Sequence, residues 1–265
     1  MSTPGSIRRD AVTDESVLAR AQEALDGFVS ATKDTPYEIK GVFFSEMLFV
    51  LSAAGHGFTG PVLESGRARG QSTFVLGRIF PDSKIISIEF DRNSPDVPIA
   101  EERLTPFGNI KLLFGDSQKL LFEHLKPDSV VIIDGPKGFR ALRLALQLLK
   151  TGKARMVFVH DTYKGLPTRR FLSHHVPGAI FSDHGPFVER FRSLDEHCWQ
   201  AFDTEGRLEW QPAGVAEPSY GPTFGCLPHV PGAPYRRMLI KLHLASFVAR
   251  MGKSFSKLFT HRGKN

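Results

Sequence analysis

Residues 61–73 read Pro61-Val62-Leu63-Glu64-Ser65-Gly66-Arg67-Ala68-Arg69-Gly70-Gln71-Ser72-Thr73. The apolar pair before Glu64 is typical of the end of a buried strand. Gly66 and Gly70 follow it, and glycine is needed where the backbone takes a positive φ or passes close to a ligand. An apolar, helix-like run begins after them, and a helix N-terminus offers free N–H groups to an anion. The stretch therefore predicts a strand, a glycine turn and a helix start.

The spacing of this turn narrows the choice of ligand. It is Glu-x-Gly-x-x-x-Gly, which differs from the tighter Gly-x-Gly-x-x-Gly of dinucleotide binders, so a pyrophosphate is not favoured. An acid at the strand tip suits a ligand that carries an amine. Taken alone, the stretch is explained equally well as a structural turn, and the segments that follow it decide between the two interpretations.

The composition is that of an ordinary soluble globular protein. The chain has 265 residues, of which 41% are hydrophobic and 23% charged, enough for one large α/β domain with extensions. Neither a signal peptide nor a membrane span is indicated, so we expect a cytoplasmic location. Cys198 and Cys226 have no metal-ligand spacing and are interpreted as packing residues.

The charge is unevenly distributed. The net charge of +6 and the pI of about 9.4 are compatible with nucleic acid or an anionic membrane surface as partner. No Asp or Glu follows Glu217, and the basic residues after it are Arg236, Arg237, Lys241, Arg250, Lys253, Lys257, Arg262 and Lys264. The basic signal therefore belongs to the tail.

Hydrophobic periodicity predicts alternating helices and strands. Helices are expected at 14–31, 42–54, about 72–79, 100–107, 141–149 and 235–259, and strands at 84–90, 109–114, 130–133 and 156–159. Residues 162–209 mix helix and loop, and the Pro/Gly-rich residues 211–234 are expected to form a linker or a surface loop. We expect an N-terminal helical cap (1–57), a Rossmann-like domain (58–210), and a Pro/Gly-rich segment with a basic, amphipathic C-terminal helix (211–265).

Acids and amides end strand after strand. Glu89 ends the second strand, roughly twenty residues beyond the glycine turn, where an acid would hold a ribose diol. Asp116-Ser117-Gln118 follow the third strand, Asp134-Gly135-Pro136-Lys137 the fourth, and His160-Asp161 the fifth. In an open parallel sheet this edge binds ligands, so the fold class expected is a doubly wound α/β sheet with its site there.

With Glu64-x-Gly66-x-x-x-Gly70, Glu89, Gly115-Asp116-Ser117-Gln118, Asp134-x-x-Lys137 and His160-Asp161 in this order, the chain resembles the class I S-adenosylmethionine-dependent methyltransferases. Within them it is most similar to the metal-dependent, catechol-type O-methyltransferases and to the cephalosporin-hydroxylase-like group. The resemblance covers about residues 40–170 and implies a Rossmann-like fold, S-adenosylmethionine as cofactor, and methylation of a hydroxyl on a small molecule or glycan.

The resemblance also implies roles for single residues. Gly66 and Gly70 would let the backbone approach the methionine part of the cofactor, Glu64 would lie near its amino group, and Ser72 would meet its carboxylate. Glu89 would bind the ribose. Asp116, Ser117 and Gln118 would flank the adenine.

For catalysis, the resemblance implies that Asp134 and Asp161 bind a Mg²⁺-type ion and that Lys137 is the general base. The chain departs from the catechol-type pattern at Thr162, where that family has a third ligand. His160 is left open as a metal ligand, as a residue that supports a ligand, or as a packed histidine. Arg67 and Arg69 are left open as solvated loop charges or as groups that steer an anionic acceptor.

Three other functions remain open: a metal-dependent hydroxylase-like enzyme on the same fold, an RNA methyltransferase that uses the basic tail, and a cofactor-binding scaffold without turnover. Asp134-Gly135-Pro136-Lys137 argues against amino methylation of bases, which uses an Asn/Asp-Pro-Pro-aromatic motif. For the C-terminal helix, a packed helix or homodimer contact is favoured over peripheral membrane binding, which its basic and aromatic composition also fits.

Overall fold

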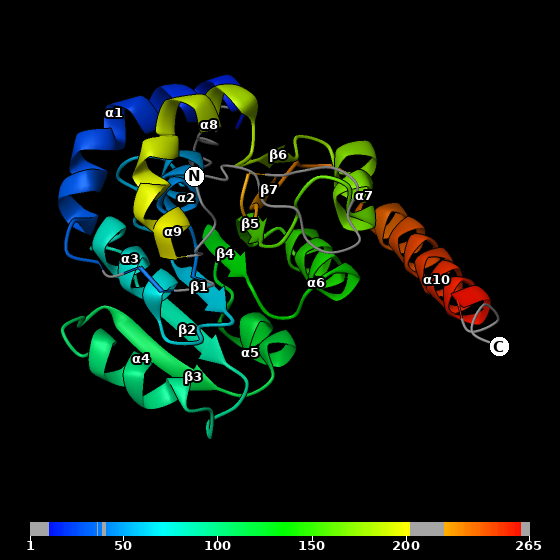
Figure 1. Ribbon diagram of the computed structural model, residues 1–265, viewed down its shortest axis with the longest axis horizontal. Helices are drawn as coiled ribbons and strands as arrows, with labels where there is room; N and C mark the ends of the chain where they lie inside the picture. The colour runs from blue at the N-terminus through cyan, green and yellow to red at the C-terminus, as the bar shows by residue number, and fades with distance from the viewer. Residues whose placement is uncertain (1–10, 36, 39–40, 202–219, 261–265) are drawn as a thin grey trace, which may run out of the picture.

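A seven-stranded sheet is the centre of the protein, as seen in a computed structural model that describes residues 11–35, 37–38, 41–201 and 220–260 (Figure 1). The strand order is β3-β2-β1-β4-β5-β7-β6. The strands are β1 (Val62–Ser65), β2 (Ile85–Glu89), β3 (Ile110–Phe114), β4 (Ser129–Ile133), β5 (Ala154–Val159), β6 (Ile180–Phe181) and β7 (Gly225–Pro228). β1 to β5 are parallel, and β7 is antiparallel to both β5 and β6. The five predicted parallel strands are therefore confirmed.

Helices cover both faces of this sheet. They are α1 (Asp14–Thr32), α2 (Phe44–Ala54), α3 (Gln71–Ile79), α4 (Asp96–Leu104), α5 (Ser117–His124), α6 (Phe139–Lys150), α7 (Pro167–His175), α8 (Gly185–Phe191), α9 (Glu196–Ala201) and α10 (Tyr235–Thr260), with a 3-10 turn at Arg192–Asp195. The doubly wound α/β architecture, the N-terminal helices and the C-terminal helix are as the sequence predicts.

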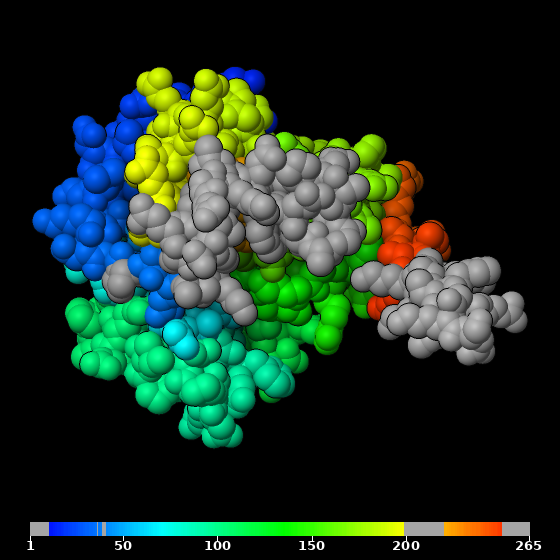
Figure 2. All heavy atoms as spheres, viewed as in Figure 1, coloured from blue at the N-terminus to red at the C-terminus, as the bar shows by residue number. Residues whose placement is uncertain are grey.

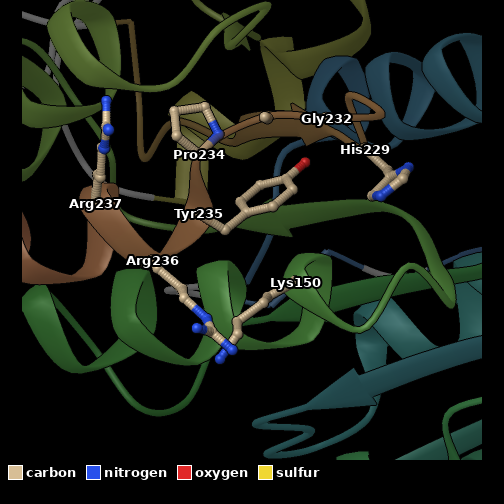
Figure 3. A pocket seen from close by; sticks show the side chains of 8 residues that line it. Lys150, His229, Gly232, Pro234, Tyr235, Arg236 and Arg237 are labelled. Carbon is tan, nitrogen blue, oxygen red and sulfur yellow. The ribbon is translucent and has the colours of Figure 1, made fainter.

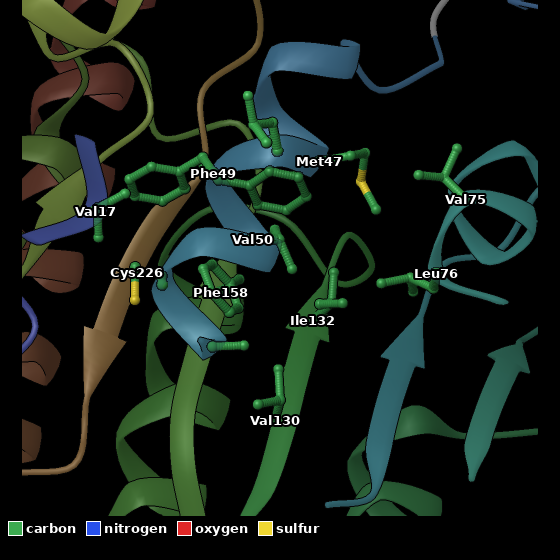
Figure 4. Close-up of a cluster of buried hydrophobic side chains, with 14 of the residues drawn as sticks. Val17, Met47, Phe49, Val50, Val75, Leu76, Val130, Ile132, Phe158 and Cys226 are labelled. Atoms are coloured by element: carbon green, nitrogen blue, oxygen red, sulfur yellow. The ribbon is translucent and has the colours of Figure 1, made fainter. Parts of the chain in front are cut away.

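The first face of the sheet is covered by α1, α2, α3 and α8. Met47, Phe49 and Val50 of α2 pack between Phe158 of β5 and Leu76 of α3 (Figure 4). Ten of the 11 residues of α2 are buried. This helix therefore belongs to the core and brings its residues close to the carboxyl ends of β4 and β5.

The second face is covered by α5, α6, α7 and α10. α6 is buried on two sides because it lies between the sheet and α10, and its core residues are Ala141, Leu142, Leu144, Ala145, Leu146, Leu148 and Leu149. α10 contributes Tyr235, Met238 and Leu242 to the same cluster. Among the described residues, no helix has the combination of length and hydropathy needed to cross a membrane.

The expectation of a linker or surface loop at 211–234 is wrong for Gly225–Pro228. These residues form β7, and Gly225, Cys226 and Leu227 are buried beside β5. The strand is only four residues long, begins with Gly225 and ends with Pro228, so its apolar pattern is too short to stand out among turn formers. The sheet therefore extends past the domain boundary expected at residue 210.

Two further differences concern helices after β2 and β3. α4 begins at Asp96, four residues before the predicted start at Ala100, because Pro98 lies in its first turn, where proline is tolerated. α5 was not predicted, and it begins directly after Asp116, whose carboxylate caps it by accepting a hydrogen bond from Gln118 N at 2.9 Å.

Candidate active site at the carboxyl edge of the sheet

The loop between β1 and α3 has the strained backbone that its sequence predicts. Gly66, Ala68 and Gly70 have φ values of 89°, 45° and 81°. A Cβ on Gly66 would lie 2.7 Å from the backbone N of Gly135, so glycine is required here by the close approach of the segment after β4. A Cβ on Gly70 would lie 3.1 Å from Leu104 of α4. Both glycines therefore fix how this loop packs.

Glu64 lies at the end of β1 and is buried. Its carboxylate accepts hydrogen bonds from the hydroxyls of Ser72 at 2.5 Å, Ser87 at 2.7 Å, and Thr73. Burial raises the pKa of Glu64, and the three hydroxyl donors oppose this rise. Glu64 therefore ties β1 to the first turn of α3, and Ser72 Oγ is engaged with it rather than pointing only to a ligand.

Glu89 lies at the end of β2, beside the same loop. Its two carboxylate oxygens accept from Ala68 N at 2.9 Å and Phe90 N at 2.8 Å. A carboxylate oxygen has more than one acceptor site, so these two backbone bonds orient the group without saturating it. The predicted ribose acid is thus held in place by the glycine loop, with acceptor capacity remaining.

The three residues expected near the adenine are less engaged. Asp116 is the cap of α5, and the side chains of Asp116 and Gln118 are exposed. Ser117 Oγ donates to Gly135 O at 3.4 Å, which is long for a hydroxyl donor. The structure places all three at the same edge as Glu89, and their contact with adenine stays a prediction.

Arg67 is not the solvated loop charge that one interpretation of the sequence offered. Its side chain is 2% exposed, donates from Nη1 to Ser87 O at 2.9 Å, and lies over the ring of Phe114 at 5.0 Å. Burial lowers the pKa of Arg67, and Glu64 and Glu89 oppose this shift. The guanidinium therefore balances the charge of the two acids beneath the loop. No spacing rule distinguishes it from exposed Arg69.

A second cluster of charges lies at the ends of β4 and β5. Lys137 Nζ bonds to the carboxylates of Asp134 and Asp161, the latter at 2.7 Å. Burial opposes the charge of Lys137, but Asp134 and Asp161 outweigh it and raise the pKa of Lys137. In this arrangement Lys137 is an ammonium between two carboxylates, which is the opposite of the lowered pKa expected of a base.

His160 joins this cluster from inside the protein. It is buried, and its Nδ1 lies 2.6 Å from Asp134 Oδ1 and 3.8 Å from Asp161 Oδ1. Single ligand atoms of Asp134, His160 and Asp161 can all lie within 4.8 Å of one another, the spacing of a metal site. Of the roles left open for His160, contact with both acids favours the first two over mere packing.

Thr162 faces away from the cluster. Its hydroxyl donates to Thr223 O at 3.0 Å, at the segment that leads into β7. It therefore does not replace the third ligand of the catechol-type pattern. His160, two residues earlier, offers a nitrogen at the cluster instead. Asp161 has a φ of 56°, uncommon for a residue other than glycine, and such strain is frequent at functional sites.

Glu46 is a residue of this region that sequence reasoning missed. It comes from α2, is buried, and its Oε2 lies 3.5 Å from His160 Nε2. Burial raises the pKa of Glu46 to about 7, although His160 opposes the rise. The available signal was a single charge within the apolar run Phe44–Ala54. A buried carboxylate in such a helix needs partners: Glu46 Oε2 accepts from Phe43 N at 2.9 Å, and His160 offers a charge beside it.

No protein-family model matches the chain, and no curated protein matches it at a significant level. Solved structures do match. The O-methyltransferase TomG from Streptomyces achromogenes, in complex with SAM, is 19% identical, with a TM-score of 0.43 over 83% of this chain and 97% of that chain. A precorrin-6y C5,15-methyltransferase from Geobacter metallireducens is 13% identical, with a TM-score of 0.44 over 73% and 92%. The SAH-bound methyltransferase PaMTH1 from Podospora anserina is 12% identical, with a TM-score of 0.42 over 85% and 99%.

With TM-scores below 0.5, these matches do not by themselves establish the fold of this chain. The topology carries more weight. Five parallel strands in the order β3-β2-β1-β4-β5 are followed by β7, which is inserted antiparallel between β5 and β6. This is the strand arrangement of the class I S-adenosylmethionine-dependent methyltransferases, and the chain has their fold.

Proposed function

We propose that the protein is an S-adenosylmethionine-dependent O-methyltransferase that acts on a hydroxyl of a small molecule or glycan with the help of a divalent cation. One observation carries the proposal. β1 pairs with β2 on one side and β4 on the other. The glycine loop after β1 therefore lies between Glu89 and the carboxylates of Asp134 and Asp161, as a cofactor spanning from its ribose to its reactive methyl group requires.

The cofactor end of the site is supported by Glu89. Its carboxylate is oriented by Ala68 N and Phe90 N and keeps acceptor capacity for two hydroxyl donors, which a ribose diol supplies. When bound, S-adenosylmethionine supplies an electrophilic methyl group for attack by an acceptor oxygen. The transfer itself then depends mainly on distance and alignment.

The donor set at the other end fits a divalent cation. Two carboxylates and one histidine nitrogen within 4.8 Å can hold a metal of the Mg²⁺ or Mn²⁺ type. A cation held by Asp134, His160 and Asp161 would lower the pKa of an acceptor hydroxyl. Lys137 bonds to the same two carboxylates in this structure, so it would give up these bonds when Asp134 and Asp161 hold the cation.

Lys137 is then the residue that moves the proton. As an ammonium bonded to both carboxylates it has no lone pair to accept a proton. Once those bonds are given up, the two acids no longer raise the pKa of Lys137 and its burial lowers that pKa, so that a neutral amine can take the hydroxyl proton at Nζ. Tyr163 lies two residues after Asp161 and is partly exposed, so it is a candidate for contact with the acceptor.

The test is calorimetric titration of the full chain with S-adenosylmethionine and with S-adenosylhomocysteine, with and without Mg²⁺. We expect binding of both ligands, and loss of binding in Glu89→Ala. The matched control is Glu102→Ala, which removes an exposed acid of α4 and leaves binding unchanged. Failure of both ligands to bind the wild type would overturn the proposal.

The metal and the acceptor are tested separately. Titration with Mn²⁺, followed by the water-proton relaxation rate, measures binding of the cation without any turnover. The variant Asp161→Asn should bind Mn²⁺ more weakly. Transfer of a labelled methyl group to a panel of phenols, catechols and glycosides then identifies the acceptor. If the protein binds the cofactor but not Mn²⁺, the proposed methyltransferase activity stands and the proposed help of a metal is wrong.

A further inference from the structure

α10 (Tyr235–Thr260) presents two opposite faces. Tyr235, Met238, Leu242 and Ser246 are buried, and the helix packs on α6 and α7. Arg143 of α6 lies 3.5 Å from His243, which marks the edge of this contact. The helix extends outward from the body at the periphery of the molecule (Figures 1 and 2). One face of α10 therefore anchors it, and the other faces away from the protein.

The outward face carries an apolar stripe. Ile240, Leu244, Phe247 and Val248 are 63%, 59%, 58% and 67% exposed. Their spacing of four, three and one residues places them on one side of the helix. Exposed apolar residues that stand alone need no explanation, but four in one row form a contact surface.

The charges around the stripe are all of one sign. None of the three neighbouring helices α6, α7 and α10 contains an Asp or Glu at any position. Their exposed cations among the described side chains are Arg140, Arg143, Lys150, Arg170, Arg236, Arg237, Lys241 and Arg250. On a helical projection Lys241 and Arg236 flank the stripe on its two sides. A partner of this surface must therefore be anionic as well as apolar.

A pocket continues the basic surface at the start of α10 (Figure 3). It is open to solvent, has a volume of about 430 Å³, and is lined by Lys150, His229, Arg236 and Arg237, together with Gly232, Ala233, Pro234 and Tyr235. No acid lines it. Lys150 and Arg236 line the same hollow although they carry like charges, an arrangement that an anion would stabilise.

We propose that α10 is a membrane-docking helix that lies in the interface of a bilayer containing anionic phospholipids. The apolar stripe enters the boundary between headgroups and acyl chains, and the flanking cations bind lipid phosphates. The pocket at Lys150 and Arg236 receives one of these phosphates. The docking face is formed by α6, α7 and α10, and its role is independent of the proposed methyl transfer.

Two other occupants fit the surface less well. A second copy of the chain that met this face through a two-fold axis would bring the same cations against themselves. Nucleic acid would satisfy the cations but would leave Leu244 and Phe247 in water. An anionic bilayer is the one of the three that satisfies both the stripe and the charges.

The test is co-sedimentation of the full chain with vesicles of phosphatidylcholine alone and of phosphatidylcholine mixed with phosphatidylglycerol. We expect binding to the anionic vesicles only, weakened by salt because the lipid charge is screened. The double variant Leu244→Ser, Phe247→Ser should lose at least about tenfold in affinity for these vesicles, because the stripe supplies the apolar burial. Arg236→Gln combined with Lys150→Gln should weaken the binding and reduce its dependence on salt.

The matched control is Val29→Ser, which removes an apolar side chain of α1 that is 44% exposed and should leave vesicle binding unchanged. Circular dichroism shows whether each variant is folded, and the buried face of α10 is intact in all of them. The proposal is overturned if the wild type ignores anionic vesicles, if it binds neutral vesicles equally well, or if the stripe variant binds like the wild type. If the chain does not bind vesicles, two results would assign the face to another occupant. A wild-type dimer that the stripe variant abolishes would indicate a second copy of the chain, and salt-sensitive binding of RNA would indicate nucleic acid.

Discussion

Glu46 Oε2 lies 3.5 Å from His160 Nε2, and both side chains are buried. The separation exceeds a good hydrogen bond, and His160 Nε2 has no hydrogen-bond partner, so the contact is one of charge. Through Asp134, at 2.6 Å from Nδ1, the histidine connects α2 with the carboxylates at the sheet edge. The N-terminal helices are therefore part of the site's electrostatics.

Replacement of Glu46 by glutamine should lower the pKa of His160. Burial alone would lower this pKa, but Asp134 and Glu46 outweigh it and raise the pKa to about 10. Removing the charge of Glu46 leaves Asp134 as the main support, so the histidine should lose its proton at lower pH. NMR titration of the imidazole carbons, in the presence of a chelator, measures this. Glu23→Gln, beside exposed His56 at 4.0 Å, is the control and should not change the titration of His160.

Replacement of Lys137 by methionine should separate metal binding from proton transfer. The variant removes the ammonium that bonds to Asp134 and Asp161, so affinity for Mn²⁺ should stay the same or rise. Methyl transfer should fall by about a hundredfold or more because the proton acceptor is lost. Lys119→Met, at an exposed pair with Glu123 on α5, should change neither quantity. Equal methyl transfer by wild type and Lys137→Met would exclude the base role.

The parts of the site that sequence analysis could find are those with a fixed place relative to a strand. Glu64, Glu89, Asp134 and Asp161 each lie within two residues of the end of an apolar run, and the parallel sheet brings such positions to one edge. Glu46 could not be placed there, because its contact with His160 depends on how α2 packs across the sheet. Long-range packing of this kind leaves no spacing in the sequence.

Long-range packing also explains why the sequence did not predict β7 or the burial of Arg67. β7 reaches β5 from a distant part of the chain, and four residues that include Gly225 and Pro228 give too short a pattern to identify a strand. Arg67 and Arg69 are two residues apart in one loop. Arg67 is nevertheless buried against the ring of Phe114, whereas Arg69 is exposed and pairs with Asp96 at 2.8 Å. Whether a loop arginine points inward is decided by the volume that neighbouring elements leave.

Replacement of Gly66 by alanine should destabilise the fold strongly. The new Cβ would lie 2.7 Å from Gly135 N, and the φ of 89° disfavours any side chain. Steric strain of both kinds should reduce the free energy of unfolding by about 2–4 kcal/mol. Urea denaturation measures it. Gly27→Ala is a control in which we expect the opposite effect. Gly27 lies within α1 and a Cβ there would have no atom within 4 Å, so alanine should raise the free energy of unfolding by about 0.5–1 kcal/mol.

Asp195 should make the stability of the protein depend on pH. Burial raises the pKa of Asp195 from 3.8 to about 6, although Ser45 and Tyr220 donate to its carboxylate at 2.9 and 2.8 Å and oppose the rise. Between these two pH values the folded state holds a proton that the unfolded state has lost. The free energy of unfolding contributed by Asp195 therefore falls as the pH rises from about 4 to about 6, by about 3 kcal/mol in all.

The variant Asp195→Asn isolates this effect because it removes the charge while an amide oxygen still accepts from Ser45 N. Urea denaturation of both proteins at several pH values gives the difference in the free energy of unfolding. We expect the wild type to lose stability relative to the variant between about pH 4 and pH 6, and the difference to be constant above that range. A difference that does not change between about pH 4 and pH 6 would mean that the pKa of Asp195 is not raised in the folded state, so that its donors at least offset the cost of burial.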